Sequence, residues 1–278
     1  MSIVCATCAA GAATWQNAAA ATRLEYLTEA DPETGERMTL EVIISDGQLL
    51  LKGDTADGLE HRVWYDDKTS IVTVLNPYEG GYYRLNPRIA KDAKHRLAAF
   101  RNKVEERIEG YDKSEIQDAL ALVAHLENQE FGGSFAGTLE YRRNGSANYN
   151  GRQCMLADVY IVGDEGAVHD RETCLAPVAE IVEQAEDART LANFGEASRT
   201  IAESVVKFAA VMPRYGSDLS EGVPVAITFL SSDSVVQFVL ETAESSASGE
   251  RIVDDDTFEI PGEYDRELPL MNRGLKSR

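Results

Sequence analysis

The stretch "VWYDDKTSIVTVLNPYEGGYYRL", residues 63–85, decides the fold, because it predicts three short β-strands joined by two tight turns. The first turn carries charged residues, and the second combines an Asn-Pro with a Gly-Gly, which are common turn formers. The middle strand, "IVTVL" at 71–75, is apolar on both sides: Val72 and Val74 face one way, and two other apolar residues face the other. We therefore expect protein to cover both faces of this strand.

The same alternation continues towards the N-terminus, so residues 22–85 as a whole predict an antiparallel meander. Met38, Leu40 and Val42 alternate with charged or polar neighbours, as in strands with one buried face. The connections "DPETGE", "SDGQ" and "GDTADG" are short and rich in turn-forming residues. Strands joined by such turns usually pair with each other, so each strand is expected to pair with the next one along the chain.

Two amphipathic helices follow and predict a helical hairpin at about residues 88–127. The apolar residues of the first helix recur at spacings of three and four, and they are Ile89, Ala93, Leu97, Phe100, Val104 and Ile108. The second helix starts at a capping-box pattern, "SEIQ" from Ser114. These helices are candidates to cover the second face of the sheet.

The first helix is unusually basic for an acidic chain. Its basic residues before position 104 are Arg88, Lys91, Lys94, Arg96, Arg101 and Lys103. Two interpretations stay open: the solvated face of a core helix, or a surface that attracts lipid headgroups or an acidic partner. In the second interpretation, Lys94, Arg96 and Arg101 are the headgroup candidates.

The rest of the chain predicts more strands and helices in separate runs. Strands return beyond Gly132, helices fit 177–192 and about 197–212, and strands fit 223–230 and 234–242. Runs of strands followed by runs of helices are typical of the α+β class.

Cys154 and Cys174 flank a predicted hairpin whose turn signal, Gly-Asp-Glu-Gly, occupies 163–166. Counting outwards from a loop centred on Asp164 places the two cysteines opposite each other, at a separation that suits a disulfide. A disulfide implies an oxidising compartment such as a bacterial periplasm. The alternative is a pair of reduced, buried cysteines in a cytosolic protein.

Residues 1–21 resemble a secretion leader or a disordered segment, and we expect removal of residues 1–20 to leave the fold intact. The segment is small and apolar and ends in Ala-x-Ala choices, although no basic residue precedes the apolar stretch. Cys5 and Cys8 form a Cys-x-x-Cys inside this segment, and the four histidines are scattered singly. We therefore predict no metal site and no cofactor. The predicted domain covers residues 22–266, and residues 267–278 form a polar tail.

The charge of the chain argues against nucleic acid as a partner. Asp and Glu number 47 against 27 Lys and Arg, a formal net charge of −20, which repels phosphate backbones. No stretch of apolar residues is long enough to predict a transmembrane segment.

Several short motifs together resemble a family of bacterial envelope proteins of unknown function. They are the stretch at 63–85, the Gly-x-x-Cys at 151–154, "GVPV" at 222–225 and "FEIPGEY" at 258–264. That family is similar in architecture to the lipoprotein carriers LolA and LolB. The resemblance extends over about residues 22–266 and implies a curved, incompletely closed antiparallel sheet, a half-barrel with helices on its concave side. It brings no catalytic residues with it.

A curved sheet with helices on one side can enclose an elongated apolar groove. Our leading hypothesis is therefore a non-enzymatic periplasmic binding or carrier protein for a lipid, an acyl chain or an apolar peptide, with a lipid, a lipoprotein or an envelope protein as partner. The groove candidates are Val72, Val74, Leu97, Phe100 and Val104. The alternative is a structural or protein-interaction module of the cell envelope, in which the helices fill the groove.

No motif supports an enzyme. "GGSFA" at 132–136 nearly matches a nucleophile elbow, but the sequence after Ser134 reads as a strand where an elbow requires a helix. "DDD" at 254–256 lacks the alternating ligands and the glycine of a calcium loop. Carboxylates are so frequent in this chain that no pair stands out for acid–base chemistry.

Overall fold

The computed structural model describes residues 21–30, 34–54, 60–106, 117, 138–163, 166–204, 215–230, 235–246, 253 and 256–268. Within these residues, eleven antiparallel strands form one sheet. The first six strands are β1 (Ala21–Thr28), β2 (Thr39–Ser45), β3 (Gln48–Asp54), β4 (Glu60–Asp66), β5 (Ile71–Asn76) and β6 (Gly81–Leu85). The other five are β7 (Thr138–Tyr149), β8 (Arg152–Gly163), β9 (Gly166–Ala176), β10 (Val223–Leu230) and β11 (Val235–Ser246).

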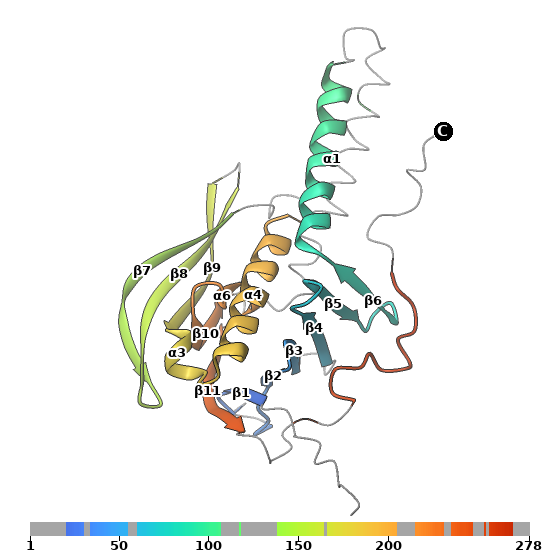
Figure 1. Ribbon diagram of the computed structural model, residues 1–278. Coiled ribbons are helices and arrows are strands. Elements are labelled where there is room, and N and C mark those ends of the chain that lie inside the picture. The colour runs from blue at the N-terminus through green and yellow to red at the C-terminus, as the bar shows by residue number, and fades with distance from the viewer. Residues whose placement is uncertain are drawn as a thin grey trace, which may run out of the picture.

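The sheet consists of two meanders joined along β1 and β11. Its strand order is β6-β5-β4-β3-β2-β1-β11-β10-β9-β8-β7, so β6 and β7 are its two edges and the sheet does not close. The helices are α1 (Pro87–Glu106), α3 (Val178–Ile181), α4 (Ala185–Ala202) and α6 (Tyr215–Asp218). Figure 1 shows the sheet curving around α4 and α6. The predicted fold class, an unclosed antiparallel sheet with helices on its concave side, is confirmed.

The stretch at 63–85 folds as its pattern predicts, into the end of β4 and the whole of β5 and β6. Val74 lies opposite Val63 on β4, and Val72 lies opposite Leu85 on β6. The side-chain oxygen of Asn76 accepts hydrogen bonds from the backbone N–H groups of the next turn, at 3.1 and 3.2 Å. This local bond explains why the chain reverses directly after β5.

Both faces of this half of the sheet are buried, each by a different part of the chain. The face that carries α4 and α6, here called the inner face, holds Val72 and Val74 in the main core. The opposite or outer face holds a second cluster, made of Ile43, Leu50, Trp64 and Leu75. Val253, Phe258 and Tyr264 pack on this second cluster. The outer face is thus covered by the C-terminal segment, residues 253–268, rather than by the helices proposed from the sequence.

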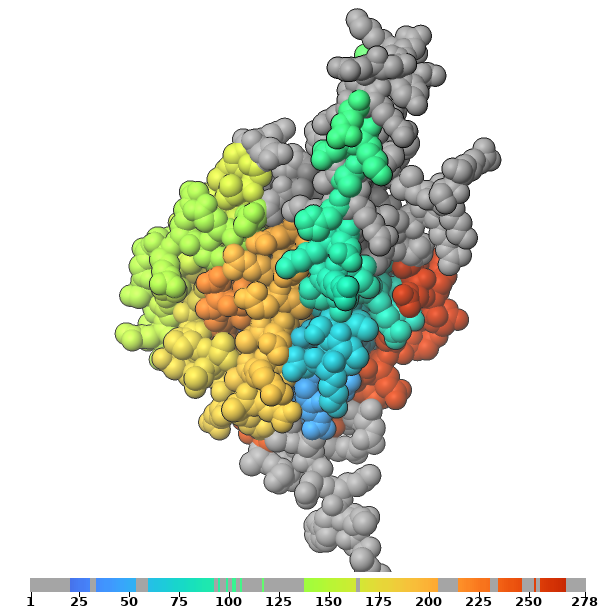
Figure 2. All heavy atoms as spheres, turned by 45° about the horizontal axis from the view of Figure 1, so that its top comes forward, coloured from blue at the N-terminus to red at the C-terminus, as the bar shows by residue number. Residues whose placement is uncertain are grey.

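The C-terminal segment also reaches the β6 edge of the sheet. The N–H of Tyr82 donates to the carbonyl of Arg266 at 3.0 Å, and the N–H of Leu268 donates to the carbonyl of Tyr82 at 2.7 Å. Leu268 itself is buried in the main core. Figure 2 shows this segment, in red, lying beside the strands near β6.

Helix α4 spans a region where the sequence predicts two helices with a break near residue 195. The predicted break was wrong, because Gly195 lies inside α4 and allows close packing there; it does not end a helix. A Cβ atom placed on Gly195 would lie 2.3 Å from the backbone nitrogen of Ser220. Only glycine lets α4 approach the chain beside α6 this closely.

Helix α1 confirms the first predicted helix of the hairpin and extends away from the sheet (Figure 1). Its residue Ala90 is buried in the main core, whereas Ile89 is half exposed. The second predicted helix lies outside the described residues apart from Gln117, which is helical. No helix among the described residues is both long enough and apolar enough to span a membrane.

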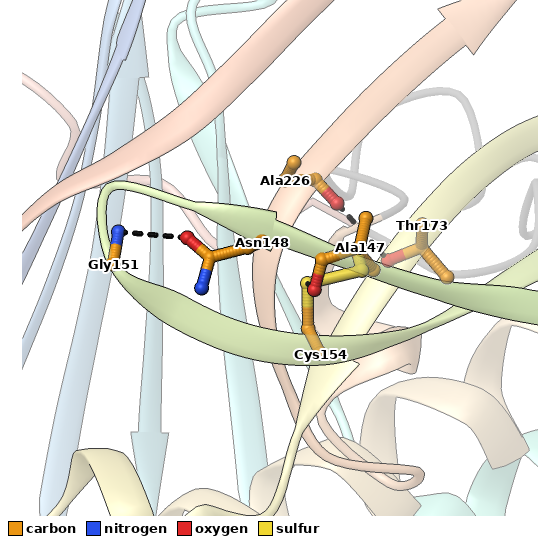
Figure 3. The surroundings of a disulfide bond; sticks show 7 residues. Ala147, Asn148, Gly151, Cys154, Thr173 and Ala226 are labelled. Atoms are coloured by element: carbon orange, nitrogen blue, oxygen red, sulfur yellow. Dashed lines mark hydrogen bonds between the residues drawn. A yellow bond between two sulfur atoms is a disulfide. The ribbon is translucent and has the colours of Figure 1, made fainter.

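The predicted disulfide between Cys154 and Cys174 is present, with the two Cα atoms 5.3 Å apart (Figure 3). The predicted register was wrong, however, because Cys174 lies opposite Leu156 and not opposite Cys154. The hairpin has a two-residue loop, and a register shift lies between Val159 and Tyr160. The loop and the register shift each move the pairing of β8 with β9 by one residue. The bridge therefore joins two residues that are diagonal neighbours on the same side of the hairpin.

Candidate binding site

The inner face, where the sequence places a ligand groove, is occupied by the protein's own side chains in the described region. Leu191, Phe194 and Ile201 of α4 and Tyr215 and Leu219 at α6 are almost completely buried against the sheet. They belong to the same core as the groove candidates Val72 and Val74. These two valines therefore contact packed protein.

The other groove candidates and the headgroup candidates lie on α1. The side chains of Leu97, Phe100, Val104, Lys94, Arg96 and Arg101 lie outside the part of the chain that the structure describes. Three basic residues of α1 that are described, Arg88, Lys91 and Lys103, are exposed. The basic face of this helix is thus solvated at these positions, and the lipid groove stays a prediction.

Helix α4 is tied to the sheet at both ends by polar contacts. At its N-terminal half, the side-chain N–H of Asn193 donates to Asp67 at 2.7 Å. At its C-terminal half, Arg199 donates to the carbonyl of Leu139, at the start of β7, at 3.1 Å, and to Glu221 at 2.7 Å. These bonds fix α4 between the two halves of the sheet and make the filling of the inner face a stable arrangement.

A buried charged cluster on β9 and α6 adds a polar element to this core. The guanidinium of Arg171, which is 1% exposed, donates through Nε to both carboxylate oxygens of Asp218, at 3.2 and 3.1 Å. It also donates to Asp170 and to the hydroxyl of Ser217. The hydroxyl of Tyr141 on β7 donates to Asp218 at 2.8 Å. Three distant segments therefore meet at one guanidinium.

The electrostatics of this cluster favour a structural role. Burial by itself lowers the pKa of Arg171, but the charge and hydrogen bonds of Asp218 more than offset this, so the pKa lies above its ordinary value. Burial, reinforced by the charge of Asp218, raises the pKa of Tyr141 well above its usual range. Both groups are thus held in one protonation state at neutral pH, which is unsuited to proton transfer.

One open site among the described residues is a cleft of about 500 Å³ on the outer face. Its floor is the sheet, including Trp64 on β4 and Ile71 on β5, and its wall is the C-terminal segment, including Phe258 and Ile260. The residues that line it are Gln48, Trp64, Tyr65, Asp66, Thr69, Ile71, Thr73, Arg84, Phe258, Glu259 and Ile260. We call this space the outer cleft.

The outer cleft is lined by both apolar and polar side chains, and three of the polar ones are charged. Trp64 is anchored, because its indole N–H donates to the carbonyl of Thr257 at 3.4 Å. Asp66 and Glu259 contribute two carboxylates, and Arg84 contributes one guanidinium. Arg84 lies over the ring of Tyr82, 5.5 Å from its centre. The lining thus combines apolar side chains with polar groups that can orient a bound segment.

A second hollow, of about 290 Å³, lies on β1, β2 and β3 and is polar. Its centre is the buried carboxylate of Glu41, which forms ion pairs with Arg23 and Lys52. The hollow carries three carboxylates, from Glu25, Glu41 and Glu60, against the two cations Arg23 and Lys52, so it has no excess of positive charge for an anionic ligand.

The sequence did not reveal the outer cleft or the Arg171 cluster. The cleft joins residues near position 65 with residues near position 258, and no local pattern connects them. One sequence signal of the Arg171 cluster was available. Adjacent residues in a strand point to opposite faces of the sheet, so the pair Asp170 and Arg171 predicts that one charged side chain faces the core. Cys5, Cys8, Ser134 and the aspartates at 254–255 lie outside the described residues.

Comparisons with known proteins show a distant likeness of fold. No family model and no curated protein matches the chain. One solved structure that matches is MucB in complex with MucA(peri), at 12% identity and a TM-score of 0.29, with 88% of this chain and 55% of that chain covered. Another is the complex of Pseudomonas aeruginosa MucA and MucB, at 13% identity and a TM-score of 0.31, with 88% and 56% covered. This chain spans little more than half the length of those chains, and a likeness of this size carries no functional argument.

Proposed function

We propose that the chain is a non-catalytic binding protein of the cell envelope that holds an apolar peptide segment of a partner protein in the outer cleft. The observation that carries this proposal is the cleft itself. It places apolar side chains of the sheet, Trp64 and Ile71, across from apolar side chains of the C-terminal segment, Phe258 and Ile260. Its volume of about 500 Å³ lies in the range of small-ligand sites.

The charges favour a peptide over a fatty acid. Two carboxylates, Asp66 and Glu259, line the cleft against one guanidinium, Arg84, and the whole chain carries a net charge of −20. An anionic headgroup is repelled by this field, whereas a peptide with a basic side chain is attracted. The preferred occupant is therefore an apolar peptide segment that is neutral or basic at its ends.

The compartment follows from the disulfide. Bridged cysteines persist in oxidising environments and are rare in the cytosol of mesophiles, so Cys154–Cys174 supports export. A periplasmic or other exported location is part of the proposal, as is the absence of an enzymatic activity.

A second candidate function is supported by the filled inner face. Because α4 and α6 occupy that face in the described region, the chain also fits a structural or protein-interaction module that carries no ligand inside. A lipid between the sheet and α1, oriented by Lys94, Arg96 and Arg101, is the carrier alternative that the sequence predicts.

Fluorescence of Trp64 tests these candidates directly. In a Trp15→Phe background Trp64 is the single tryptophan, since the chain has two. The probes are a short acetylated and amidated peptide of alternating leucine and lysine, and dodecanoate. Trp64 is only 6% exposed in the free protein, so we expect the peptide to change the intensity of its emission, with saturation at micromolar concentration, about −8 kcal/mol.

Two variants locate the binding. Ile260→Asp places a charge in the wall of the cleft and should abolish the change in emission, whereas Val235→Asp, at a 67% exposed position on β11, should leave it unaffected. Preferential binding of dodecanoate, insensitive to Ile260→Asp, would favour the lipid carrier. If neither probe binds, the chain is the structural or protein-interaction module.

A further inference from the structure

A group of three side chains that can ligate a metal lies on the strand pair β8–β9, away from the outer cleft. Ligand atoms of Asp158, His169 and Glu172 all lie within 4.8 Å of one another. We propose that these three residues bind a divalent transition-metal ion of the zinc class. This site goes beyond the proposed peptide binding and does not depend on it.

The backbone of β9 brings the three residues together. Asp158 on β8 lies directly opposite Glu172 on β9. Two positions further, Tyr160 lies opposite His169, because Asp170 is an extra residue in β9 without a partner on β8. Such a bulge reverses the side to which the following residues point. His169 therefore shares a face with Asp158 and Glu172, while Asp170 and Arg171 are both buried.

The ring nitrogen of His169 is the second observation that points to a ligand. Its Nε2 is buried and has no hydrogen-bond partner, although it lies 3.8 Å from Oδ1 of Asp158. This distance is too long for a hydrogen bond and leaves the nitrogen unsatisfied. An ion between the imidazole and the carboxylate would give the nitrogen a partner at the ordinary metal–ligand distance of about 2.0 Å.

Neighbouring side chains hold the ligands in place. The ring of His169 stacks on Tyr160, with ring centres 4.9 Å apart. The amide of Asn144 donates to Oδ1 of Asp158 at 2.8 Å, which orients that carboxylate. Arg142 on β7, which lies opposite Asp158, is paired with Glu140 at 2.9 Å, so its charge is already balanced. Supporting contacts of this kind are what a metal site needs around its ligands.

The donor set selects the class of metal. One imidazole nitrogen and two carboxylate oxygens suit Zn²⁺ and similar first-row ions, whereas Mg²⁺ and Ca²⁺ prefer oxygen ligands alone. Three protein ligands leave a fourth position, which water fills in sites of this type.

Competition with a chromophoric chelator measures the binding of Zn²⁺ to the full chain. The background carries Cys5→Ser and Cys8→Ser, because thiolates of a Cys-x-x-Cys also bind zinc. We expect one equivalent of Zn²⁺ to bind and an excess of Mg²⁺ not to displace it. Co²⁺ should give the intense visible absorption of a four-coordinate site, whereas a hydrated ion on the surface absorbs only weakly.

Single substitutions assign the ligands. Glu172→Gln and His169→Gln should each weaken Zn²⁺ binding at least ten-fold, and Asn144→Ala should weaken it about ten-fold through the orientation of Asp158. Glu172 is exposed, so Glu172→Gln tests the site without disturbing the fold. The matched control is His61→Gln, since Nε2 of His61 is also buried without a partner but belongs to no ligand group among the described residues.

The expected result is binding weakened by these factors in the three site variants and undiminished binding in His61→Gln. The proposal is overturned if the Cys5→Ser/Cys8→Ser protein binds no zinc in the competition assay. It is equally overturned if Glu172→Gln and His169→Gln bind zinc as tightly as their parent.

Discussion

The hydroxyl of Tyr215 on α6 donates a hydrogen bond to the hydroxyl of Tyr26 on β1 at 2.5 Å, and both side chains are fully buried. Their rings meet edge to face, with centres 5.1 Å apart. The two residues are 189 positions apart in the sequence, so this contact joins the helical layer to the centre of the sheet.

We predict that this contact makes the protein sensitive to alkali. Burial raises the pKa of both Tyr26 and Tyr215 above the ordinary value, and it raises the pKa of Tyr65 to about 12. Because these pKa values are raised in the folded state, the free energy of unfolding is unaffected by these tyrosines below the pKa of an unfolded tyrosine, about 10. It falls as the pH rises above that value, since the unfolded chain then loses protons more readily. Absorbance at 295 nm should show these tyrosines ionising together with unfolding.

The variant Tyr215→Phe removes the donor of this bond. We expect the free energy of unfolding at neutral pH to fall by about 1–3 kcal/mol, because the hydroxyl of Tyr26 is left buried without its partner. Tyr78→Phe is the control, since Tyr78 is 67% exposed. Equal denaturation midpoints for Tyr215→Phe and its parent would contradict this prediction.

The Cys154–Cys174 bridge should contribute to stability in the oxidised protein. The cysteines are separated by 20 positions. The chain-entropy model assigns a loop of this size about 3 kcal/mol. Cys174→Ser should therefore lower the melting temperature, and a reducing agent should lower that of the parent but not that of the variant. A parent whose melting temperature is unaffected by reduction would show that the bridge adds nothing.

Gly195→Ala should destabilise the protein although alanine is the better helix former. Alanine gains up to about 1 kcal/mol of helix propensity over glycine. The new Cβ would lie 2.3 Å from the backbone nitrogen of Ser220, so α4 must move away from its neighbour. We expect a net loss of about 1–3 kcal/mol, typical of overpacking. Gly262→Ala is the control, because nothing lies within 4 Å of its Cβ position; a more stable Gly195→Ala would refute the packing argument.

The local part of the fold could be predicted from the sequence, since it depends on neighbours in the chain. The meander from β1 to β6, the β8–β9 hairpin and α1 each follow from alternation, turn residues or helical spacing. The break predicted near Gly195 failed for a physical reason. Glycine weakens a helix in isolation, but here close contact with Ser220 outweighs that preference.

The candidate sites depend on contacts that no local pattern encodes. The outer cleft needs Trp64 beside Phe258, and the proposed metal site needs the bulge at Asp170. The same bulge, together with the two-residue loop, caused the error in the cysteine register. Two one-residue shifts add up to a shift of two, which leaves Cys154 and Cys174 on the same face of the hairpin. The disulfide was therefore predicted correctly although the register was wrong.

The junction of the two meanders has a consequence for biosynthesis. Ala21 and Ser246, which meet where β1 pairs with β11, are separated by 225 positions. Strands β2 to β6 can pair as soon as they have been synthesised, but one edge of β1 stays unpaired until residues 235–246 have followed. An unpaired edge recruits other chains, so newly made protein is exposed to aggregation during this interval. A chain that stops before β11 would therefore yield an aggregating intermediate rather than a smaller folded protein.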